Sequence, residues 1–325
     1  MSDALAVSVG LSAAVVAVEG DAPQILLAQS GGGSADVLGL PSGPFEPLRH
    51  RTLEIGLRTF IAEQSGLDVG YVEQLYTFGD RGRSAAPGDT APHMVSIGYL
   101  ALTRRPRDGS ALAQAGALFR PWYAFFPWED WRRRRPEVLD TTILPALERW
   151  TAAAPDTEAG RALPRRVRAR QCFGIDGAPW DEEKVLDRYE LLYEAGLVEE
   201  AARDGRRAAL DRDSLPNLGE PMRDDHRRIL ATAMGRLRAK LKYRPVVFEL
   251  MPRRFTLSAL QGAVEAIAGR KLHKQNFRRL VETTALVEPT GAAETATGGR
   301  PAQLYRFRRE VLEERPAPGL RFGRG

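Results

Sequence analysis

A short basic segment in the C-terminal part of the chain carries the side chains with the clearest chemistry. Over residues 271–284, apolar residues recur at helical spacing, which predicts one buried stripe. Gln275, Arg278 and Arg279 fall on the opposite face. Arginine and glutamine side chains pair with the edges of guanine and adenine when a helix lies in a major groove. The segment therefore indicates a DNA-reading helix, and the alternative is a solvated amphipathic helix.

The residues around this helix complete a helix-turn-helix followed by a hairpin. Thr256 precedes a helical pattern that ends at Gly269, so we expect it to cap that helix. Residues 285–288 and 303–307 read as two short strands, and the Gly-rich segment between them is the expected tip of a wing. The candidate DNA-binding residues are Thr256, Ser258, Lys274, Gln275, Asn276, Arg278, Arg279 and Arg300.

Positive charge is concentrated in the same region. Residues 245–325 contain 14 Lys and Arg against 8 Asp and Glu, a net charge of +6. The whole chain carries +5, so the first 244 residues sum to −1. A basic surplus confined to one small module is the electrostatic footprint of a nucleic-acid-binding domain.

The composition of the chain argues against several other classes of protein. The single cysteine, Cys172, suits a reducing compartment, and we expect it to be a small buried side chain. No apolar run approaches the ~20 residues of a membrane-spanning helix, and no signal peptide is recognisable. The four histidines are scattered without zinc-type spacing, and there is no phosphate-binding loop or dinucleotide fingerprint. We therefore expect a cytoplasmic protein with no bound metal and no required cofactor.

The N-terminal part resembles the Nudix fold. Strand patterns at 11–18, 25–28, 71–78 and 94–102 surround a predicted helix at 52–65. The segment from Gly43 to Leu67 stands where the family has its metal-binding box. Aligned on Gly66 and Leu67, the chain keeps Ile61 and Glu63 of that box.

Most of the carboxylates of the box are replaced. Thr59 and Phe60 stand where the family has an Arg-Glu pair, and Gln64 replaces the second of two adjacent glutamates. Nudix chemistry needs several carboxylates to hold Mg²⁺ against a pyrophosphate. We therefore expect no catalytic residues and no hydrolysis, while the pocket still binds a nucleotide.

A second candidate for ligand binding follows the strand that ends near Gly79. Asp80, Arg81 and Arg83 lie in a Gly-containing loop, where two arginines could clamp phosphates. A solvated turn is the alternative. The candidate effector-binding residues are Glu63, Asp80, Arg81 and Arg83.

Together, the two regions resemble the NrtR-type regulators of NAD metabolism, and most closely their longer relatives, the NadQ regulators of alphaproteobacteria. The residues that carry the resemblance are 74–80, 225–245, Phe255-Thr-Leu257, Asn276-Phe-Arg-Arg279 and Gly299-Arg-Pro-Ala302. The resemblance implies a homodimeric repressor of NAD-biosynthesis genes that binds a palindromic operator. It also implies an adenine nucleotide (NAD, ATP or ADP-ribose) as effector. Whether the effector tightens or releases DNA stays open at this point.

The fold expected is α+β: a Nudix-like α/β/α sandwich with a helical insertion, followed by a winged helix-turn-helix domain. The boundaries are 1–103 for the first part of the Nudix-like domain, 104–219 for the insertion, 220–244 for a linking helix that completes that domain, and 245–325 for the winged helix. Within the insertion we expect helices at 129–151 and 181–195. Six aromatic residues in 121–131 predict local core, with adenine stacking or a subunit interface as alternatives.

Two functions from different classes remain. One is a ligand-gated transcriptional repressor. The other is a Nudix-type nucleotide pyrophosphohydrolase with an accessory nucleic-acid-binding module. Mg²⁺-dependent release of product from ADP-ribose or NAD discriminates between them.

Overall fold

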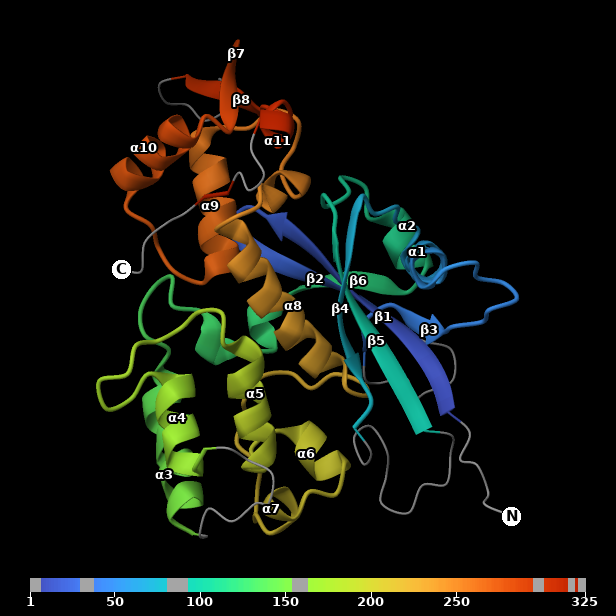
Figure 1. Ribbon diagram of the computed structural model, residues 1–325, viewed down its shortest axis with the longest axis vertical. Helices are drawn as coiled ribbons and strands as arrows, with labels where there is room; N and C mark the ends of the chain where they lie inside the picture. The colour runs from blue at the N-terminus through green and yellow to red at the C-terminus, as the bar shows by residue number, and fades with distance from the viewer. Residues whose placement is uncertain are drawn as a thin grey trace.

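The computed structural model describes residues 7–29, 38–80, 93–153, 163–294, 301–314 and 319–320. A twisted sheet with its covering helices forms one side of the molecule, and a bundle of short helices lies beside it (Figure 1). A third unit, built from the last 80 residues, lies above both.

The central sheet has strand order β4-β5-β1-β2-β6, with β3 paired to part of β1. Only β1 and β5 run parallel among the pairs recorded in this sheet, and the other pairs are antiparallel. The strands are β1 Val7–Glu19, β2 Ala22–Ala28, β3 Ser42–Pro44, β4 Tyr71–Phe78, β5 His93–Leu102 and β6 Ala117–Pro121.

Both faces of the sheet are covered, because successive residues of β1 point to opposite sides. Leu11 and Val15 pack in the core formed with α1 (Leu53–Ser65). Ala14 and Val16 belong to the core on the other face, where α8 (His226–Leu241) packs. This arrangement is the α/β/α sandwich that the sequence predicts, and α8 is the linking helix that completes it.

Helix α1 begins and ends where the sequence indicates. The Thr52 hydroxyl accepts a hydrogen bond from the amide of Ile55 at 3.2 Å, which caps the first turn. Gly66 ends the helix with φ of +68°, a left-handed conformation that glycine adopts without steric cost.

Two expectations about the middle of the chain are corrected. The sheet does not end before residue 103, because β6 adds an edge strand beside β2. No continuous helix spans 129–151: the backbone is irregular through the Arg132–Arg135 run, and helical backbone begins again only at Glu137, leading into η3 (Leu139–Ile143) and α3 (Leu144–Ala152). Pro136 follows the run directly, and a proline disfavours helical backbone in the residue before it.

The rest of this region consists of short helices. The expected helix at 181–195 is shorter than predicted, because it begins at Val185. The bounds are α2 Ser110–Gln114, η1 Trp122–Ala124, η2 Pro127–Glu129, α4 Arg165–Phe173, α5 Val185–Glu194, α6 Glu199–Arg203 and α7 Arg207–Leu210.

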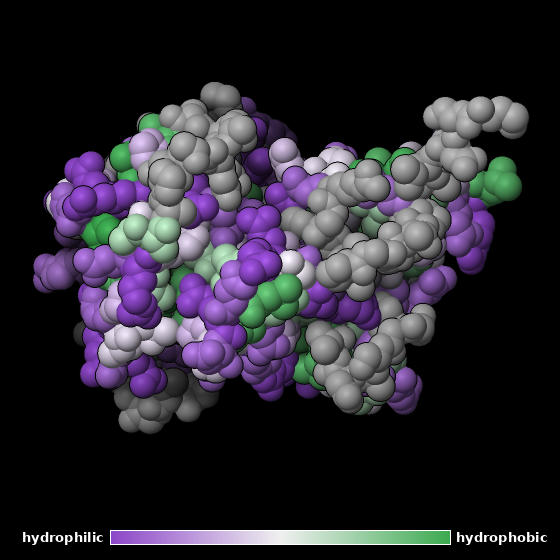
Figure 2. Space-filling model, turned by 90° about the horizontal axis from the view of Figure 1, so that it is seen from below, coloured by the Kyte–Doolittle hydropathy of each residue, from purple (hydrophilic) through white to green (hydrophobic). Residues whose placement is uncertain are grey.

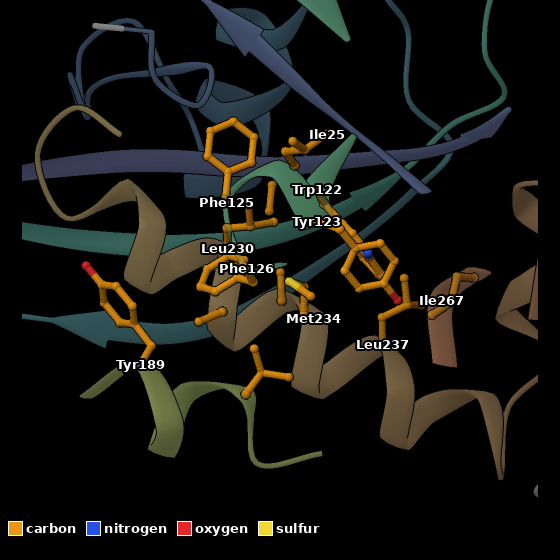
Figure 3. Packing of buried hydrophobic residues seen from close by; sticks show 14 of the residues in the cluster. Ile25, Trp122, Tyr123, Phe125, Phe126, Tyr189, Leu230, Met234, Leu237 and Ile267 are labelled. Carbon is orange, nitrogen blue, oxygen red and sulfur yellow. The ribbon is translucent and has the colours of Figure 1, made fainter. Parts of the chain in front are cut away.

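The aromatic segment is core, as the sequence favours. Trp122, Phe125, Phe126 and Trp128 are all at most 1% exposed. Figure 3 shows Trp122, Phe125 and Phe126 between the sheet and α8, where Leu230 and other α8 residues meet the rings. The segment therefore joins the sheet, the short helices and α8 into one hydrophobic cluster, and its rings are not exposed for stacking on a base.

A buried ion network lies at the centre of this cluster. The Glu129 carboxylate accepts hydrogen bonds from Arg188 Nε and from Arg238 Nη1, each at 2.6 Å. All three side chains are at most 1% exposed. Burial alone raises the pKa of a carboxyl group, but the two guanidinium groups hold the pKa of Glu129 below its ordinary value. The carboxylate is therefore charged and ties the 122–131 segment to α5 and α8.

No helix among the described residues is long and apolar enough to cross a membrane. Where the lower face of the molecule is coloured in Figure 2, most of it is hydrophilic, with scattered hydrophobic residues.

The Glu129→Gln variant is expected to lower the free energy of unfolding by about 3–5 kcal/mol, because two buried guanidinium groups lose their counter-charge. Urea unfolding followed by circular dichroism measures the change. The control is Glu137→Gln, whose exposed carboxylate lies 3.6 Å from Arg134, and it should change stability by less than about 1 kcal/mol. Equal stability of the two variants contradicts a central role for Glu129.

Candidate DNA interface and effector site

The C-terminal unit has the order and pairing of a winged helix. Its elements are η4 Val246–Glu249, α9 Leu257–Ala268, α10 Lys274–Thr284, β7 Val287–Glu294, β8 Ala302–Phe307 and α11 Val311–Glu314. Strands β7 and β8 form an antiparallel hairpin, and Phe255 adds a bridge to Tyr305. Phe248 stacks on Phe307 with ring centroids 4.3 Å apart, which fixes the hairpin to the start of the domain.

Helix α10 is amphipathic as predicted, although it begins at Lys274 and not at residue 271. Phe277 and Val281 are buried against the rest of the domain. The opposite face is exposed, and no hydrogen bond or ion pair within the described residues uses its side chains. The exposed polar side chains on α10 that were candidates for DNA binding are Lys274, Gln275, Asn276, Arg278 and Arg279.

The candidates at the start of α9 have different roles. The Thr256 hydroxyl accepts the amide hydrogen of Ala259 at 3.1 Å, so this residue caps the helix. Ser258 is exposed in the first turn. Arg253 and Arg254, which the sequence analysis did not select, are exposed just before the helix. Arg300 lies outside the described residues.

The turn between α9 and α10 is held by the rest of the protein. Arg238 of α8 donates to the Ile267 carbonyl at 3.0 Å, and the Tyr123 hydroxyl donates to the Ala266 carbonyl at 2.7 Å. The Trp131 amide donates to the Gly269 carbonyl at 2.7 Å. The last carbonyls of α9, which have no partner inside the helix, are thus satisfied by two other parts of the chain.

Gly269 makes this close approach possible. Its φ is +72°, and an added Cβ would lie 2.6 Å from the Glu129 carbonyl and 2.9 Å from the Tyr123 hydroxyl. Both the backbone conformation and the lack of space therefore require glycine.

Side chains of the segment that corresponds to the Nudix box pack against β3. The Phe60 ring lies against Gly43, where an added Cβ would meet the ring at 2.5 Å. Gln64 donates to the Ser42 carbonyl at 2.7 Å and accepts from the Ser42 amide at 3.1 Å. Glu63 is exposed on the surface of α1. Among the described residues no three His, Cys, Asp or Glu side chains are grouped so as to hold a metal ion.

Asp80 meets the long helix α8. Its carboxylate lies 2.5 Å from Arg228, which also contacts Glu190 of α5 at 2.6 Å and Asp225 at 3.1 Å. Burial alone lowers the pKa of Arg228, but the three carboxylates outweigh this effect, so the pKa lies above its ordinary value. The structure therefore connects the end of β4 to α8 and to the short helices. Arg81 and Arg83 lie outside the described residues, so their predicted roles stay predictions.

His226 is buried near the same end of α8. Its Nδ1 accepts the Leu40 amide at 2.9 Å, which leaves the hydrogen on Nε2, 3.4 Å from the Ser12 hydroxyl. Burial and the charge of Arg223 lower the pKa of His226 to about 3. Because the ring carries its hydrogen on the nitrogen that faces Ser12, His226 cannot act as the base that would activate the Ser12 hydroxyl.

Cys172 is buried, as expected, and burial raises the pKa of its thiol to about 11. The thiol is therefore protonated near neutral pH and is a packing residue.

Comparison with known proteins assigns the C-terminal unit. Residues 247–307 match the family model described as the NrtR DNA-binding winged helix domain. The matched residues lie within the C-terminal unit. The "ADPR responsive transcriptional repressor NtrR" of Acinetobacter baylyi is 45% identical to this chain over 83 residues. That match covers 26% of this chain and 33% of the relative, so the chain spans only about a third of the relative's length.

Solved structures extend the likeness in fold to the whole chain. The crystal structure of Shewanella oneidensis NrtR complexed with a 27mer DNA has a TM-score of 0.56 at 18% identity, covering 94% of this chain and 95% of that one. A MutT/nudix family protein from Enterococcus faecalis has a TM-score of 0.51 at 14% identity, covering 95% and 89%. The fold is therefore that of the NrtR proteins, a Nudix-like domain followed by a winged helix. The narrower NadQ resemblance stays a prediction.

The single variants Arg278→Ala and Arg279→Ala should each weaken duplex DNA binding by about 1–3 kcal/mol if the replaced side chain contacts a base. Fluorescence anisotropy on a duplex selected by the wild-type protein measures the change. The control is Arg149→Ala, an exposed arginine of α3 at the opposite end of the molecule. Unchanged affinity in both single variants removes α10 from the interface.

His226 should make folding stability depend on pH. Its folded pKa lies below the unfolded value of 6.5, so the contribution is constant above pH 6.5 and is lost as the pH falls toward 3. The slope approaches about 1.4 kcal/mol per pH unit, because the unfolded state binds the proton first. Urea unfolding at several pH values should show a shallower dependence for His226→Gln than for the wild type. The exposed control, His273→Gln, should keep the wild-type slope.

Proposed function

We propose that this protein is a transcriptional repressor whose affinity for operator DNA is set by an adenine nucleotide bound to its Nudix-like domain. The observation that carries the proposal is the outer face of α10, which is exposed and cationic and has no ion-pair partner in the part of the chain that the structure describes. In a winged helix this face meets base edges, while the wing and the start of the preceding helix meet the backbone.

The relative from Acinetobacter baylyi supports the nature of the signal, since its name describes a repressor responsive to ADP-ribose. We take ADP-ribose as the first candidate effector, with NAD and ATP as the others. We further propose that the protein acts as a homodimer on a palindromic operator and controls genes of NAD biosynthesis. A dimer must place two α10 helices about 34 Å or a multiple apart to meet successive half-sites.

We propose that the Nudix-like domain senses without hydrolysing. Phe60 and Gln64 contribute no carboxylate, and both are used to pack the box against β3. A pyrophosphatase needs several carboxylates on Mg²⁺, and Glu63 alone is a poor site for a hard divalent ion. The competing function, a Nudix-type pyrophosphohydrolase, requires Mg²⁺-dependent turnover of a nucleoside diphosphate derivative.

Helix α8 is the proposed route from the effector to DNA. Near its start, Arg228 contacts Asp80, which follows β4 and precedes the candidate residues Arg81 and Arg83 in the sequence. Near its end, Arg238 holds the C-terminus of α9. A nucleotide that displaces Asp80 from Arg228 changes the position of α8, and with it the two α10 helices of a dimer. A ligand shifts such an equilibrium only by its differential affinity for the two states, typically about 1–3 kcal/mol.

Arg228→Ala should leave ligand-free DNA binding near the wild-type value and remove most of the response to ADP-ribose. The test titrates ADP-ribose, NAD and ATP into a gel shift at fixed salt, with Mg²⁺-dependent product release followed in parallel. The matched control on the same helix is Arg236→Ala, whose partner is Glu73 on β4, and it should keep the response. A full response in the Arg228 variant contradicts this route, and robust turnover of any of the three nucleotides contradicts a non-hydrolytic sensor.

A further inference from the structure

The run Arg132–Arg135 is the most concentrated positive charge outside the winged helix, and it lies beside the turn that precedes α10. Trp131, the residue before the run, donates its amide hydrogen to the Gly269 carbonyl at 2.7 Å. Helix α10 begins five residues after Gly269, so its first residue is at most about 18 Å away along the chain. The green segment that follows η2 in Figure 1 accordingly reaches the turn between α9 and α10.

The two ends of the run are fixed. Arg132 donates to both carboxylate oxygens of Asp130 at 2.8 Å, and its guanidinium lies 5.0 Å from the centre of the Tyr123 ring. Arg135 makes a two-oxygen contact with Asp140 at 2.9–3.2 Å and lies over Trp131. Tyr123 belongs to the hydrophobic core and Trp131 packs against it, whereas Asp140 is exposed.

The two middle arginines are left for another partner. Arg133 is exposed and makes no hydrogen bond or ion pair in the described part of the chain. Arg134 makes one contact, to Glu137 at 3.6 Å, in which both side chains are more than 70% exposed. An ion pair this exposed contributes little and is easily exchanged. The short stretch therefore holds two exposed guanidinium groups, which have no strong partner among the described residues.

We propose that Arg133 and Arg134 form a second contact with the DNA backbone, on phosphates flanking the bases that α10 reads. The proposal rests on the proposed function of the winged helix, and it assigns to the middle segment a role in DNA affinity. Guanidinium groups suit phosphate because their donors match two oxygens at once. The position beside the helix-turn-helix turn suits a flanking strand, because a helix in the major groove is bordered by phosphates on both sides. Such contacts add affinity and fix orientation without reading sequence.

The test uses the full-length protein and the tightest 40-base-pair duplex that the wild type selects from a random library. Arg133→Ala/Arg134→Ala should bind it about 10- to 30-fold more weakly at ~0.15 M salt, and the slope of log K against log salt should fall by about 2, for two lost phosphate contacts. The ranking of base substitutions in the duplex should stay as in the wild type. Arg133→Lys/Arg134→Lys should restore most of the affinity, because lysine also binds phosphate as a point charge.

Two controls make the result specific. Arg149→Ala/Arg207→Ala removes the same charge from α3 and α7, which lie at the end of the molecule opposite α10 in Figure 1, and should leave affinity and slope within twofold of wild type. Trimming base pairs from the ends of the duplex should weaken the wild type until it matches the Arg133/Arg134 variant, and should weaken that variant less. An unchanged melting temperature shows that the variant is folded.

The outcomes separate this proposal from the function on which it rests. If Arg278→Ala weakens binding while Arg133→Ala/Arg134→Ala does not, the winged helix binds DNA and the second contact is wrong. The second contact is also wrong if the Arg149/Arg207 control loses as much affinity, since the effect is then one of net charge. If the wild type selects no duplex at all, the proposed function fails first.

Discussion

The buried contact of Glu129 with Arg188 and Arg238 is the interaction on which the arrangement of the molecule depends. Each of the three residues comes from a different part of the chain: the aromatic segment, α5 and α8. Arg238 also reaches the last turn of α9, so one side chain belongs both to the core and to the support of the DNA-binding unit. A charged group is stable at this depth only when its partners are fixed, because each ion loses its hydration. The network therefore specifies one relative position of the three segments.

Helix α8 connects the two ends of the proposed signalling path because it has a different partner on each turn. His226 and Arg228 face the loops near β3 and β4, while Arg238 faces α9. In the middle of the helix, Leu230 and Met234 are buried and face the sheet (Figure 3). In the mechanism proposed above, a helix packed along its whole length moves as a unit, so that a change near Asp80 reaches α9. The same packing carries the aromatic segment, and with it the Arg132–Arg135 run, to the turn before α10.

Much of the fold follows from local patterns. The apolar run of β1, the helix expected at 52–65 and the stripe of Phe277 and Val281 depend on neighbours close in sequence, so their positions could be predicted directly. The exposed face of α10 was predictable for the same reason. Strand β6 was not, because five residues inside the predicted helical insertion give no sign that they pair with β2. The helix expected at 129–151 failed because its charged first part is held by ion pairs and bends before Pro136.

By itself, the sequence determined that the C-terminal part forms a basic winged helix and that the Nudix box has lost most of its carboxylates, because residue type and spacing decide both. Only the tertiary structure decided what replaced the box, since the contacts of Phe60 with Gly43 and of Gln64 with Ser42 join residues about twenty positions apart. It also decided the partners of Arg228 and Arg238 and the place of the arginine run. These depend on which segments meet in space, and a buried charge takes its partner from whichever segment the packing of the core brings near.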